Sequence, residues 1–429
     1  MSDYKPRVID DILGDVLGGI GAVLLTGPKW CGKTTTASQH SKSILKMQDP
    51  DKKKDYLAIA DTKPSLLLKG EAPRLIDEWQ MAPVLWDAVR NEVDERGLDG
   101  QFILTGSTSV DESAIMHSGT GRIARLKMLP MSLYESGEST GEVSLTRLFN
   151  DPDYEIDGAI SHLEIEQLVF AACRGGWPAS LQKKNDRQKL YVAASYVDNI
   201  CESDISTVDD VSRDPQYAHA ILKSYARNIS TLAANTTIIK DLQTNFSYKS
   251  APTFYSYINA LNRLFVIEDV PAWSPSIRSA SAIRAGSKKE FTDPSIAVAA
   301  QGLSFEKLLM DLKTFGFIFE TLCIRDLKVY AMKQGGHISY YHDKTGLEAD
   351  AVLHLRDGRY ALFEFKLGSR DIEEGAMHLN KLHDLIIVHN SKNEGFIPEP
   401  NLKIVITGGQ MAYRRKDGVY VIPIGCIGV

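Results

Sequence analysis

The stretch Gly27-Pro-Lys-Trp-Cys-Gly-Lys-Thr34 matches the pattern G-x-x-x-x-G-K-[ST] and decides the fold of this chain. It follows the short apolar run 22–26 and precedes residues 33–45, whose composition predicts a helix. A glycine-rich turn between a strand and a helix lets backbone N–H groups curl around phosphate groups, above the positive end of the helix. The stretch therefore predicts a phosphate-binding loop in an α/β sheet.

This loop predicts ATP and Mg²⁺ as its ligands. The residues expected to bind the nucleotide are Gly27, Pro28, Lys29, Trp30, Cys31, Gly32, Lys33, Thr34 and Thr35. The ammonium of Lys33 would reach the β- and γ-phosphates and act in catalysis, and the hydroxyl of Thr34 would ligate Mg²⁺.

Further short apolar runs lie at 57–60, 74–77 and 102–105, separated by segments of helical composition. Such runs predict parallel strands that are buried on both faces. Strands and helices in alternation are typical of a doubly wound sheet, which binds its ligand at the carboxyl ends of the strands.

Polar residues end two of these runs at the point where a ligand would lie. Asp77 is expected to hold Mg²⁺ through water, and Glu78 to orient or deprotonate the attacking water. Beyond the run at 102, Thr105 or Ser107 would sense the γ-phosphate, although strands often end in threonine or serine.

Arg122 is the candidate for stabilising charge in the transition state. It follows the glycine-rich segment Ser118-Gly-Thr-Gly, which is flexible enough to deliver a guanidinium group to a phosphate. An arginine of this kind acts within its own chain or on a neighbouring copy, so we expect some homo-oligomerisation. A surface or salt-bridged arginine is an equal alternative.

These features resemble the AAA-like ATPases of bacteria and archaea that carry a C-terminal domain of the DUF4143 type. The resemblance continues through Glu78-Trp-Gln80, Pro130-Met-Ser-Leu-Tyr-Glu135, Gly175-Gly-Trp-Pro178, Tyr196-Val-Asp-Asn-Ile-Cys-Glu-Ser-Asp-Ile205, Leu347-Glu-Ala-Asp350 and Glu364-Phe-Lys366. It implies an α/β fold in which a P-loop ATPase sheet is followed by a helical winged-helix region and a small nuclease-like α/β domain. The corresponding units are a P-loop ATPase domain at 1–135, a helical lid or linker at 136–214, a winged helix-turn-helix region at 215–300 and a nuclease-like domain at 301–429.

The middle of the chain is the part most compatible with DNA. Residues 215–290 carry nine Lys and Arg against four Asp and Glu, whereas the whole chain has a formal net charge of −6. The segment 250–264 opens with a capping serine and an early proline. Its apolar residues form one helical stripe, made by Phe254, Tyr257, Ile258, Leu261 and Leu264.

Together with a preceding short helix and the strand-like segment 265–270, this helix predicts a winged helix-turn-helix. The residues expected to contact double-stranded DNA are Ser256, Asn259, Arg263, Arg278, Arg284, Lys288 and Lys289. A winged helix that serves only as a docking module is the alternative.

Four residues near the C-terminal end resemble the active site of the PD-(D/E)xK nuclease fold. Glu320 lies on the inward stripe of a helix predicted over 317–330, together with Phe317. Asp350 falls on one predicted strand, and Glu364 and Lys366 on the next strand, after a turn at 357–359. In that fold the acids bind Mg²⁺ and the lysine helps to activate water. The alternatives are an inactive remnant of such a site and a Glu–Lys pair on an ordinary sheet.

The composition excludes several other classes of protein. The five cysteines are dispersed and form no C-x-x-C pair, so neither a disulfide framework nor a structural zinc site is expected. The longest apolar stretch near the start is shorter than the ~20 residues of a membrane helix. The first residues lack the pattern of a secretory signal. We therefore expect a cytoplasmic protein that does not associate with membranes.

The sequence thus predicts a Mg²⁺-dependent ATPase whose nucleotide state repositions the winged-helix and nuclease-like parts, and which acts on or near DNA. Two alternatives stay open. In one, ATP is a latch in a regulatory protein-binding module whose nuclease-like fold is inactive. In the other, ATP gates a metal-dependent endonuclease.

Overall fold

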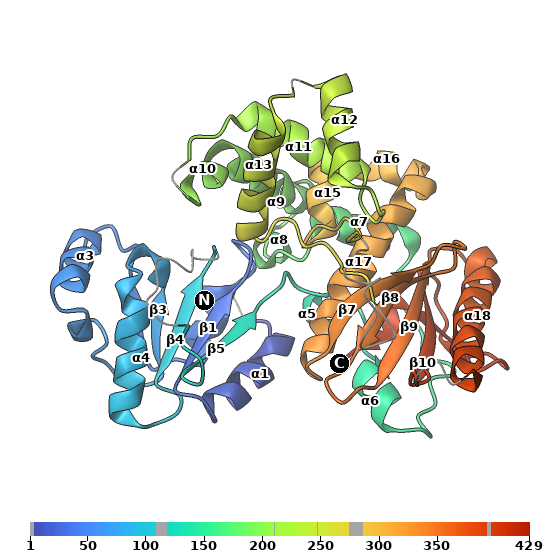
Figure 1. The fold of residues 1–429 in the computed structure, drawn as a ribbon, viewed down its shortest axis with the longest axis horizontal. Coiled ribbons are helices and arrows are strands. Elements are labelled where there is room, and N and C mark those ends of the chain that lie inside the picture. The colour runs from blue at the N-terminus through green and yellow to red at the C-terminus, as the bar shows by residue number, and fades with distance from the viewer. Residues whose placement is uncertain (1–3, 109–117, 210, 247, 274–285, 393–395) are drawn as a thin grey trace.

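The computed structural model describes residues 4–108, 118–209, 211–246, 248–273, 286–392 and 396–429. They form a parallel sheet near the N-terminus, a helical region in the middle of the chain and a mixed sheet near the C-terminus (Figure 1). In this view the helical region lies above the two sheets.

The first sheet consists of parallel strands in the order β2-β3-β4-β1-β5. They are β1 (Ala22–Thr26), β2 (Ser43–Lys46), β3 (Arg74–Asp77), β4 (Phe102–Gly106) and β5 (Ile123–Lys127). Helices α1 (Val8–Leu17) and α2 (Lys33–Gln39) pack on one face, and α3 (Lys53–Thr62) and α4 (Val84–Arg96) on the other. The predicted doubly wound α/β class is confirmed.

Two of the predicted boundaries in this sheet are wrong. The run at 57–60 is not a strand but part of α3, where Ala60 is buried, Ile59 is half-buried and Ala58 is exposed. The helix predicted over 33–45 ends at Gln39, and the edge strand β2 begins at Ser43. A run of four apolar residues does not distinguish a strand from one face of a helix, and packing against α4 decides for the helix here.

The helical region begins after the first sheet. Its elements are α7 (Ile165–Arg174), α8 (Pro178–Leu181), α9 (Asp186–Asn199), the π-helical turn η4 (Ile200–Asp204), α10 (Ile205–Thr207), α11 (Pro215–Arg227), α12 (Asn235–Asn245), α13 (Ala251–Arg263), α15 (Pro294–Gln301) and α16 (Phe305–Met310). Ser250 caps α13 by accepting a hydrogen bond from the N–H of Thr253 at 3.2 Å. The predicted apolar stripe of α13 is buried along its whole length.

The strand predicted over 265–270 does not form. Isolated antiparallel bridges join Ile267 to Phe291 and Val270 to Lys288, and the N–H of Glu268 donates to the carbonyl oxygen of Glu290 at 2.9 Å. The segment therefore pairs with the chain that returns beside it, but as separate bridges and not as a regular strand.

The second large sheet has the order β11-β12-β10-β9-β8-β7. Its strands are β7 (His337–His342), β8 (Glu348–His354), β9 (Tyr360–Lys366), β10 (Leu402–Thr407), β11 (Tyr413–Arg414) and β12 (Tyr420–Pro423). The long helix α17 (Leu312–Met332) packs on one face with Ala351 and Leu353. The helix α18 (Ile372–Ser391) packs on the other face with Val352 and Leu362. Alternate residues of each central strand therefore meet different helices.

A segment of the predicted linker 136–214 lies against this second sheet (Figure 1). The short helix α5 (Leu133–Ser136) leads into this segment. The segment contains β6 (Val143–Ser144), which pairs with β13 (Ile427–Gly428), and α6 (Leu145–Asn150). The short helices η1 (Pro64–Leu66), η2 (Trp79–Met81), η5 (Ser369–Asp371) and η6 (Ile424–Cys426) complete the described elements.

Two expectations from composition can be compared with the structure. All five cysteines are free and buried. Across the described ranges, no helix combines the length and the apolarity that crossing a membrane requires.

The turn Gly175-Gly-Trp-Pro178 joins the three regions. The N–H of Gly176 donates to Asp293 at 2.8 Å, and the carbonyl of Gly176 accepts from the N–H of Met131 at 2.7 Å. Asp293 also accepts from the buried guanidinium of Arg325, which pairs with Asp326. Asp326 in turn accepts from the N–H of Leu133 at 3.0 Å. This buried network connects the end of the first sheet to α15 and α17.

Gly176→Ala should destabilise the protein by about 1–3 kcal/mol, because an added Cβ would lie 2.2 Å from the carbonyl oxygen of Met131. Gly316→Ala is the matched control: it lies within α17 with nothing within 4 Å of the new Cβ, and alanine should stabilise the helix by about 0.5–1 kcal/mol. Thermal unfolding midpoints measure both. Equal midpoints for Gly176→Ala and the parent would show that this turn does not require glycine.

Candidate functional site

The candidate nucleotide site lies at the carboxyl edge of the first sheet, where β3, β4 and β1 are neighbours. β1 leads directly into the glycine-rich loop, and the ends of β3 and β4 place Asp77 beside Thr105. Thr34 and Thr105 each donate a hydroxyl hydrogen bond to Oδ1 of Asp77 at 2.7 Å. Asp77 is buried, so Thr34 and Asp77, the pair expected at the magnesium ion, are in contact inside the protein.

The loop is closed around the side chain of Lys33. Its ammonium donates to the carbonyl oxygens of Gly27 at 3.0 Å and Pro28 at 2.7 Å, and the residue is buried. The turn depends on glycine: Gly27 has φ +148°, and a Cβ there would lie 2.0 Å from the carbonyl oxygen of Met128. The phosphate-binding pattern therefore has the strand-turn-helix setting that it requires.

Glu78 has an unusual backbone conformation. Its φ of +57° is in the left-handed region, which a non-glycine residue adopts at a cost of ~1–3 kcal/mol and most often at functional sites. Its carboxylate accepts hydrogen bonds from the side chain of Gln80 and, at 3.3 Å, from the hydroxyl of Ser107. Ser107 therefore lies beside the predicted base, whereas Thr105 faces Asp77.

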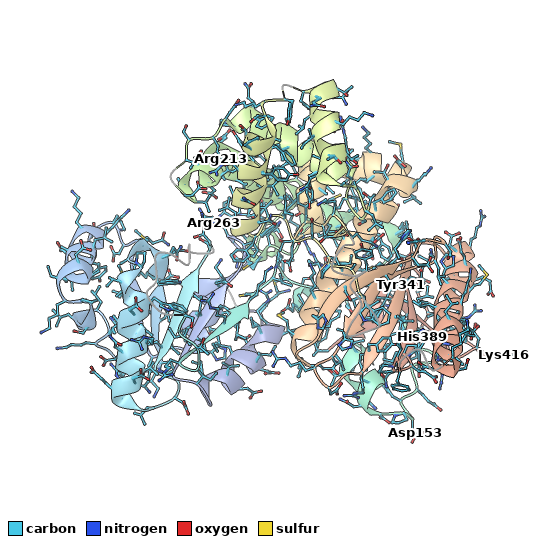
Figure 2. The ribbon with its side chains drawn as sticks, viewed as in Figure 1. Asp153, Arg213, Arg263, Tyr341, His389 and Lys416 are labelled. Carbon is cyan, nitrogen blue, oxygen red and sulfur yellow. The ribbon has the colours of Figure 1, made fainter. Side chains whose placement is uncertain are left out.

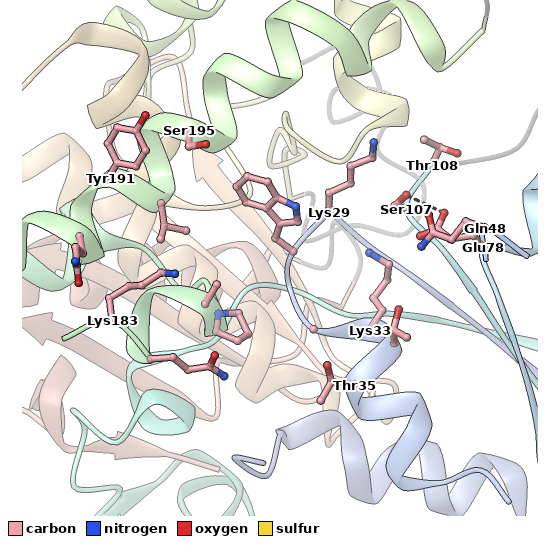
Figure 3. Close-up of a pocket in the computed structure, with 18 of the residues that line it drawn as sticks. Lys29, Lys33, Thr35, Gln48, Glu78, Ser107, Thr108, Lys183, Tyr191 and Ser195 are labelled. Atoms are coloured by element: carbon pink, nitrogen blue, oxygen red, sulfur yellow. Dashed lines mark hydrogen bonds between the residues drawn. The ribbon is translucent and has the colours of Figure 1, made fainter. Parts of the chain in front are cut away.

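A cleft of about 1560 Å³ opens in front of these residues (Figure 3). From the first region it is lined by Lys29, Trp30, Gly32, Lys33, Thr34, Thr35, Gln48, Glu78, Gln80, Met81, Ser107 and Thr108. From the helical region it is lined by Pro178, Ala179, Gln182, Lys183, Lys184, Arg187, Gln188, Tyr191, Val192, Ser195 and Thr207. Figure 3 shows Lys33, Glu78 and Ser107 on one side and Lys183, Tyr191 and Ser195 on the other.

The basic side chains of the far wall, Lys183, Lys184 and Arg187, were not found by sequence reasoning. They follow the Gly175-Gly-Trp-Pro178 turn in the chain but match no phosphate-binding pattern. Only the folding of α8 and α9 over the loop brings them to the cleft.

Two residues in the middle of the loop contact the helical region. The ammonium of Lys29 pairs with Asp204 at 2.7 Å, and the ring of Trp30 meets that of Tyr196 edge-on at 5.7 Å. Tyr196 also stacks on Trp177, with ring centroids 4.3 Å apart. Asp204 is the last residue of the π-helical turn that follows α9, a kind of irregularity that is frequent at functional sites.

The back of the loop is held by Arg7, which the sequence analysis also missed. Its guanidinium donates to the carbonyl oxygens of Cys31 at 2.9 Å and Leu129 at 2.8 Å. It also pairs with Glu135 at 3.0 Å, in the segment Pro130-Met-Ser-Leu-Tyr-Glu135. The sequence around Arg7 matches no known motif, so only these contacts reveal that it holds the loop.

Of the roles left open for Arg122, the structure contradicts the one on the phosphates of its own chain. Arg122 immediately precedes β5, and β5 runs parallel to β1, so Arg122 lies at the amino edge of the sheet and the loop at the carboxyl edge. The five residues of β5 separate the two edges by roughly 16 Å at ~3.3 Å per residue. The guanidinium pairs instead with Asp94 at 2.8 Å.

The predicted DNA contacts are mostly engaged elsewhere. Lys288 and Lys289 are buried, which contradicts their prediction as phosphate contacts. Ser256 is half-buried and accepts a hydrogen bond from Arg213 at 2.9 Å, which removes it from the exposed face of α13. Asn259 is exposed. Arg278 and Arg284 lie outside the described residues.

Arg263 lies at the end of α13, in the same helical region as Arg213 (Figure 2). Its guanidinium is 3.9 Å from Asp209, which is the ion-pair partner of Arg213. The arginine is half-buried. Asn259 is thus exposed, whereas Ser256 and Arg263 are each half-buried beside a charged partner.

The C-terminal candidates form two groups that share Asp350. Glu364 lies opposite Asp350 on the paired strands, and Lys366 contacts Glu364 at 2.9 Å beneath α18. Glu320 reaches Asp350 only through Lys288. Phe317 is 44% exposed, so it is not on the inward stripe that the sequence predicted for Glu320. α17 becomes buried around most of its surface only from Ile318 onward.

Burial dominates the electrostatics of these acids. It raises the pKa of Glu364 to about 9, and the neighbouring carboxylate of Asp350 adds to this effect. Burial alone would lower the pKa of Lys288, but the carboxylates of Glu320 and Asp350 raise it above the ordinary lysine value. The ammonium of Lys288 therefore carries its charge inside the protein.

Family comparisons match three successive parts of the chain. The model described as "AAA domain" matches residues 20–137. Two models described as domains of unknown function match the rest: DUF8612 at residues 165–307 and DUF4143 at residues 315–427.

Curated relatives are uncharacterized proteins of Mycobacterium tuberculosis and Mycobacterium bovis. Each is 23% identical over 361 residues, which cover 80% of this chain and 70% of the relative. A solved structure, a Walker-type ATPase of Pyrococcus abyssi, is 12% identical and matches with a TM-score of 0.41 over 70% of this chain and 99% of its own. By the family matches, the chain carries an AAA domain over residues 20–137 and a DUF4143 domain over residues 315–427.

Proposed function

We propose that this protein binds ATP with Mg²⁺ in the cleft, hydrolyses it, and transmits the state of the nucleotide to the helical region. The observation that carries the proposal is the contact of Thr34 with Asp77 at the carboxyl edge of the parallel sheet, next to Lys33 and Glu78. An ATPase with this loop depends on positioning and charge stabilisation around the phosphates.

The residues present fit a magnesium ion. The hydroxyl of Thr34 and the carboxylate of Asp77 supply the hard oxygen ligands that Mg²⁺ prefers. When bound, the ion would offset the charge of the phosphate oxygens. Thr105 keeps Asp77 oriented by donating to the same carboxylate oxygen.

Lys33 and Glu78 have separate tasks in this proposal. Phosphate oxygens would replace the carbonyl oxygens of Gly27 and Pro28 as acceptors for the ammonium of Lys33. Glu78, fixed by its strained backbone and by Ser107, would accept a proton from the attacking water.

Glu78→Gln should leave ATP binding within a few-fold of the parent and lower the hydrolysis rate by about 100-fold or more, because an amide cannot take the proton. Phosphate release and calorimetric titration with ATP measure the two properties. Glu92→Gln is the control, since Glu92 pairs with Arg96 on α4 outside the cleft. Unchanged turnover in Glu78→Gln would instead favour the nucleotide as a latch.

Arg122 lies at the wrong edge of its own sheet, so it acts on a neighbouring copy or is only the surface partner of Asp94. If copies complete each other's sites, specific ATPase activity should rise with protein concentration, and Arg122→Ala should abolish that rise. The measurement is turnover across a dilution series. A specific activity that is flat in the parent would remove both the proposed homo-oligomer and this arginine from the mechanism.

The path to the helical region starts within the loop itself. Lys29 and Trp30 bind Asp204 and Tyr196, and Gly32 lies against Pro178, whose Cγ would be 3.4 Å from an added Cβ. If phosphate binding moves the loop, it therefore also moves the loop residues that contact α8, α9 and the π-helical turn.

Asp204→Asn should reduce this coupling and leave the loop intact. In the parent, ATP should change the amide hydrogen exchange of 186–204, and in Asp204→Asn the change should be smaller at saturating ATP, because the pair with Lys29 is lost. Asp198→Asn, on the neighbouring helix α9, is the control, since the carboxylate of Asp198 is 61% exposed. An identical ATP response in Asp204→Asn and the parent would contradict the proposed path.

Action on or near double-stranded DNA stays a separate proposal. The division of the chain into domains at 1–135, 136–214, 215–300 and 301–429 is also still a proposal. The described support for action on DNA is limited to Asn259 and Arg263 on α13, in the basic middle of the chain. The same ATPase assay with double-stranded DNA added tests it, and stimulation that an Asn259→Ala, Arg263→Ala double variant loses would support it.

A further inference from the structure

Lys288 lies between the carboxylates of Glu320 and Asp350 in the C-terminal region, and not at the surface where its charge predicted a contact with DNA. Its backbone is fixed by two hydrogen bonds with Val270, each 2.9 Å long. Its side chain is only 8% exposed and runs between α17 and β8. A buried ammonium in this position needs oxygen acceptors around it.

The structure supplies those acceptors from two chain segments. Nζ of Lys288 lies 2.5 Å from Oε1 of Glu320, 3.3 Å from the carbonyl oxygen of Asp350 and 3.7 Å from Oδ1 of Asp350. The ring of Tyr340 lies on a further side, with its centroid 5.8 Å away. Two carboxylates and a backbone carbonyl are the oxygen types that a divalent cation such as Mg²⁺ or Mn²⁺ selects.

We propose that Lys288 is the resident cation of this site: its ammonium takes the position between Glu320 and Asp350 that a divalent metal would occupy, so the nuclease-like site is closed to metal. A metal ion at that position would need the same oxygens and would lie within a few ångströms of a fixed positive charge, which is strongly unfavourable in a buried setting.

The remaining acids of the site also lie beside donors or cations of the protein, although neither oxygen of the buried Glu364 carboxyl group accepts a hydrogen bond from the described residues. Oδ2 of Asp350 accepts a hydrogen bond from the N–H of Phe365 at 2.8 Å. Glu364 has the ammonium of Lys366 at 2.9 Å and the ring of His378 at 3.5 Å. Within the ranges that the structure describes, no three His, Cys, Asp or Glu side chains are arranged to hold a metal ion. Lys288 and Lys366 thus offset the negative charge of these acids, as a metal ion would in an open site.

The test is Mn²⁺ binding by nucleotide-free protein, measured as the loss of the electron paramagnetic resonance signal of free Mn²⁺. Lys288→Met keeps the length of the side chain and removes the charge, so it should create one site that binds Mn²⁺ at least tenfold more tightly than the parent does. Adding Asp350→Asn to this variant should remove the site. Lys289→Met is the matched control, because Lys289 is also buried but pairs with Asp269, and it should gain no site. A folded Lys288→Met that binds no more Mn²⁺ than the parent would overturn the proposal.

A second comparison decides the question if Lys288→Met does not fold. The parent and Asp350→Asn, each with Lys288 in place, should bind Mn²⁺ equally, because neither has an open position between the acids. A nucleotide-independent Mn²⁺ site in the parent that Asp350→Asn abolishes would overturn the proposal. Neither result bears on ATP hydrolysis, which depends on a different region of the chain.

Discussion

The parallel register of β1, β3 and β4 is the constraint on which the candidate site depends. Because the three strands run in the same direction and are neighbours, the loop after β1 and the acids after β3 reach the same edge of the sheet. The 2.7 Å contact between Thr34 and Asp77 is the direct consequence, although the two residues are far apart in the chain. An antiparallel arrangement would send one of them to the opposite edge of the sheet, where Arg122 lies because it precedes the parallel strand β5 and does not follow it.

The sequence predicts the position of a residue well when the residues that it contacts lie within a few positions of it in the chain. The loop 27–34, the acids after β3, the stripe of α13 and the hairpin at 357–359 have signals within a few residues, and the structure has the corresponding elements. The run at 57–60 is the exception: four apolar residues fit either a strand or one face of a helix, and only packing decides.

The residues that the sequence misplaced have partners from remote segments. Lys288 was expected at a DNA phosphate because lysine is usually exposed, but Glu320 and Asp350 converge on it from α17 and β8. The same is true of Arg7, whose acceptors are carbonyl oxygens of residues more than 20 positions away. Charge and periodicity describe one segment at a time, whereas a buried ion pair is a property of the assembled fold.

The ion pairs that join the three regions differ in how easily they break. Lys29 and Asp204 form a partly exposed pair, and such pairs contribute about 0–1 kcal/mol. Arg325 with Asp293 and Asp326 is fully buried, and removing one partner of a buried pair costs about 3–5 kcal/mol. A nucleotide that moves the loop would therefore separate the loop from the π-helical turn well before it loosens α15 from α17. It follows that α15 and α17, and with them the C-terminal sheet, should move as one body relative to the nucleotide cleft.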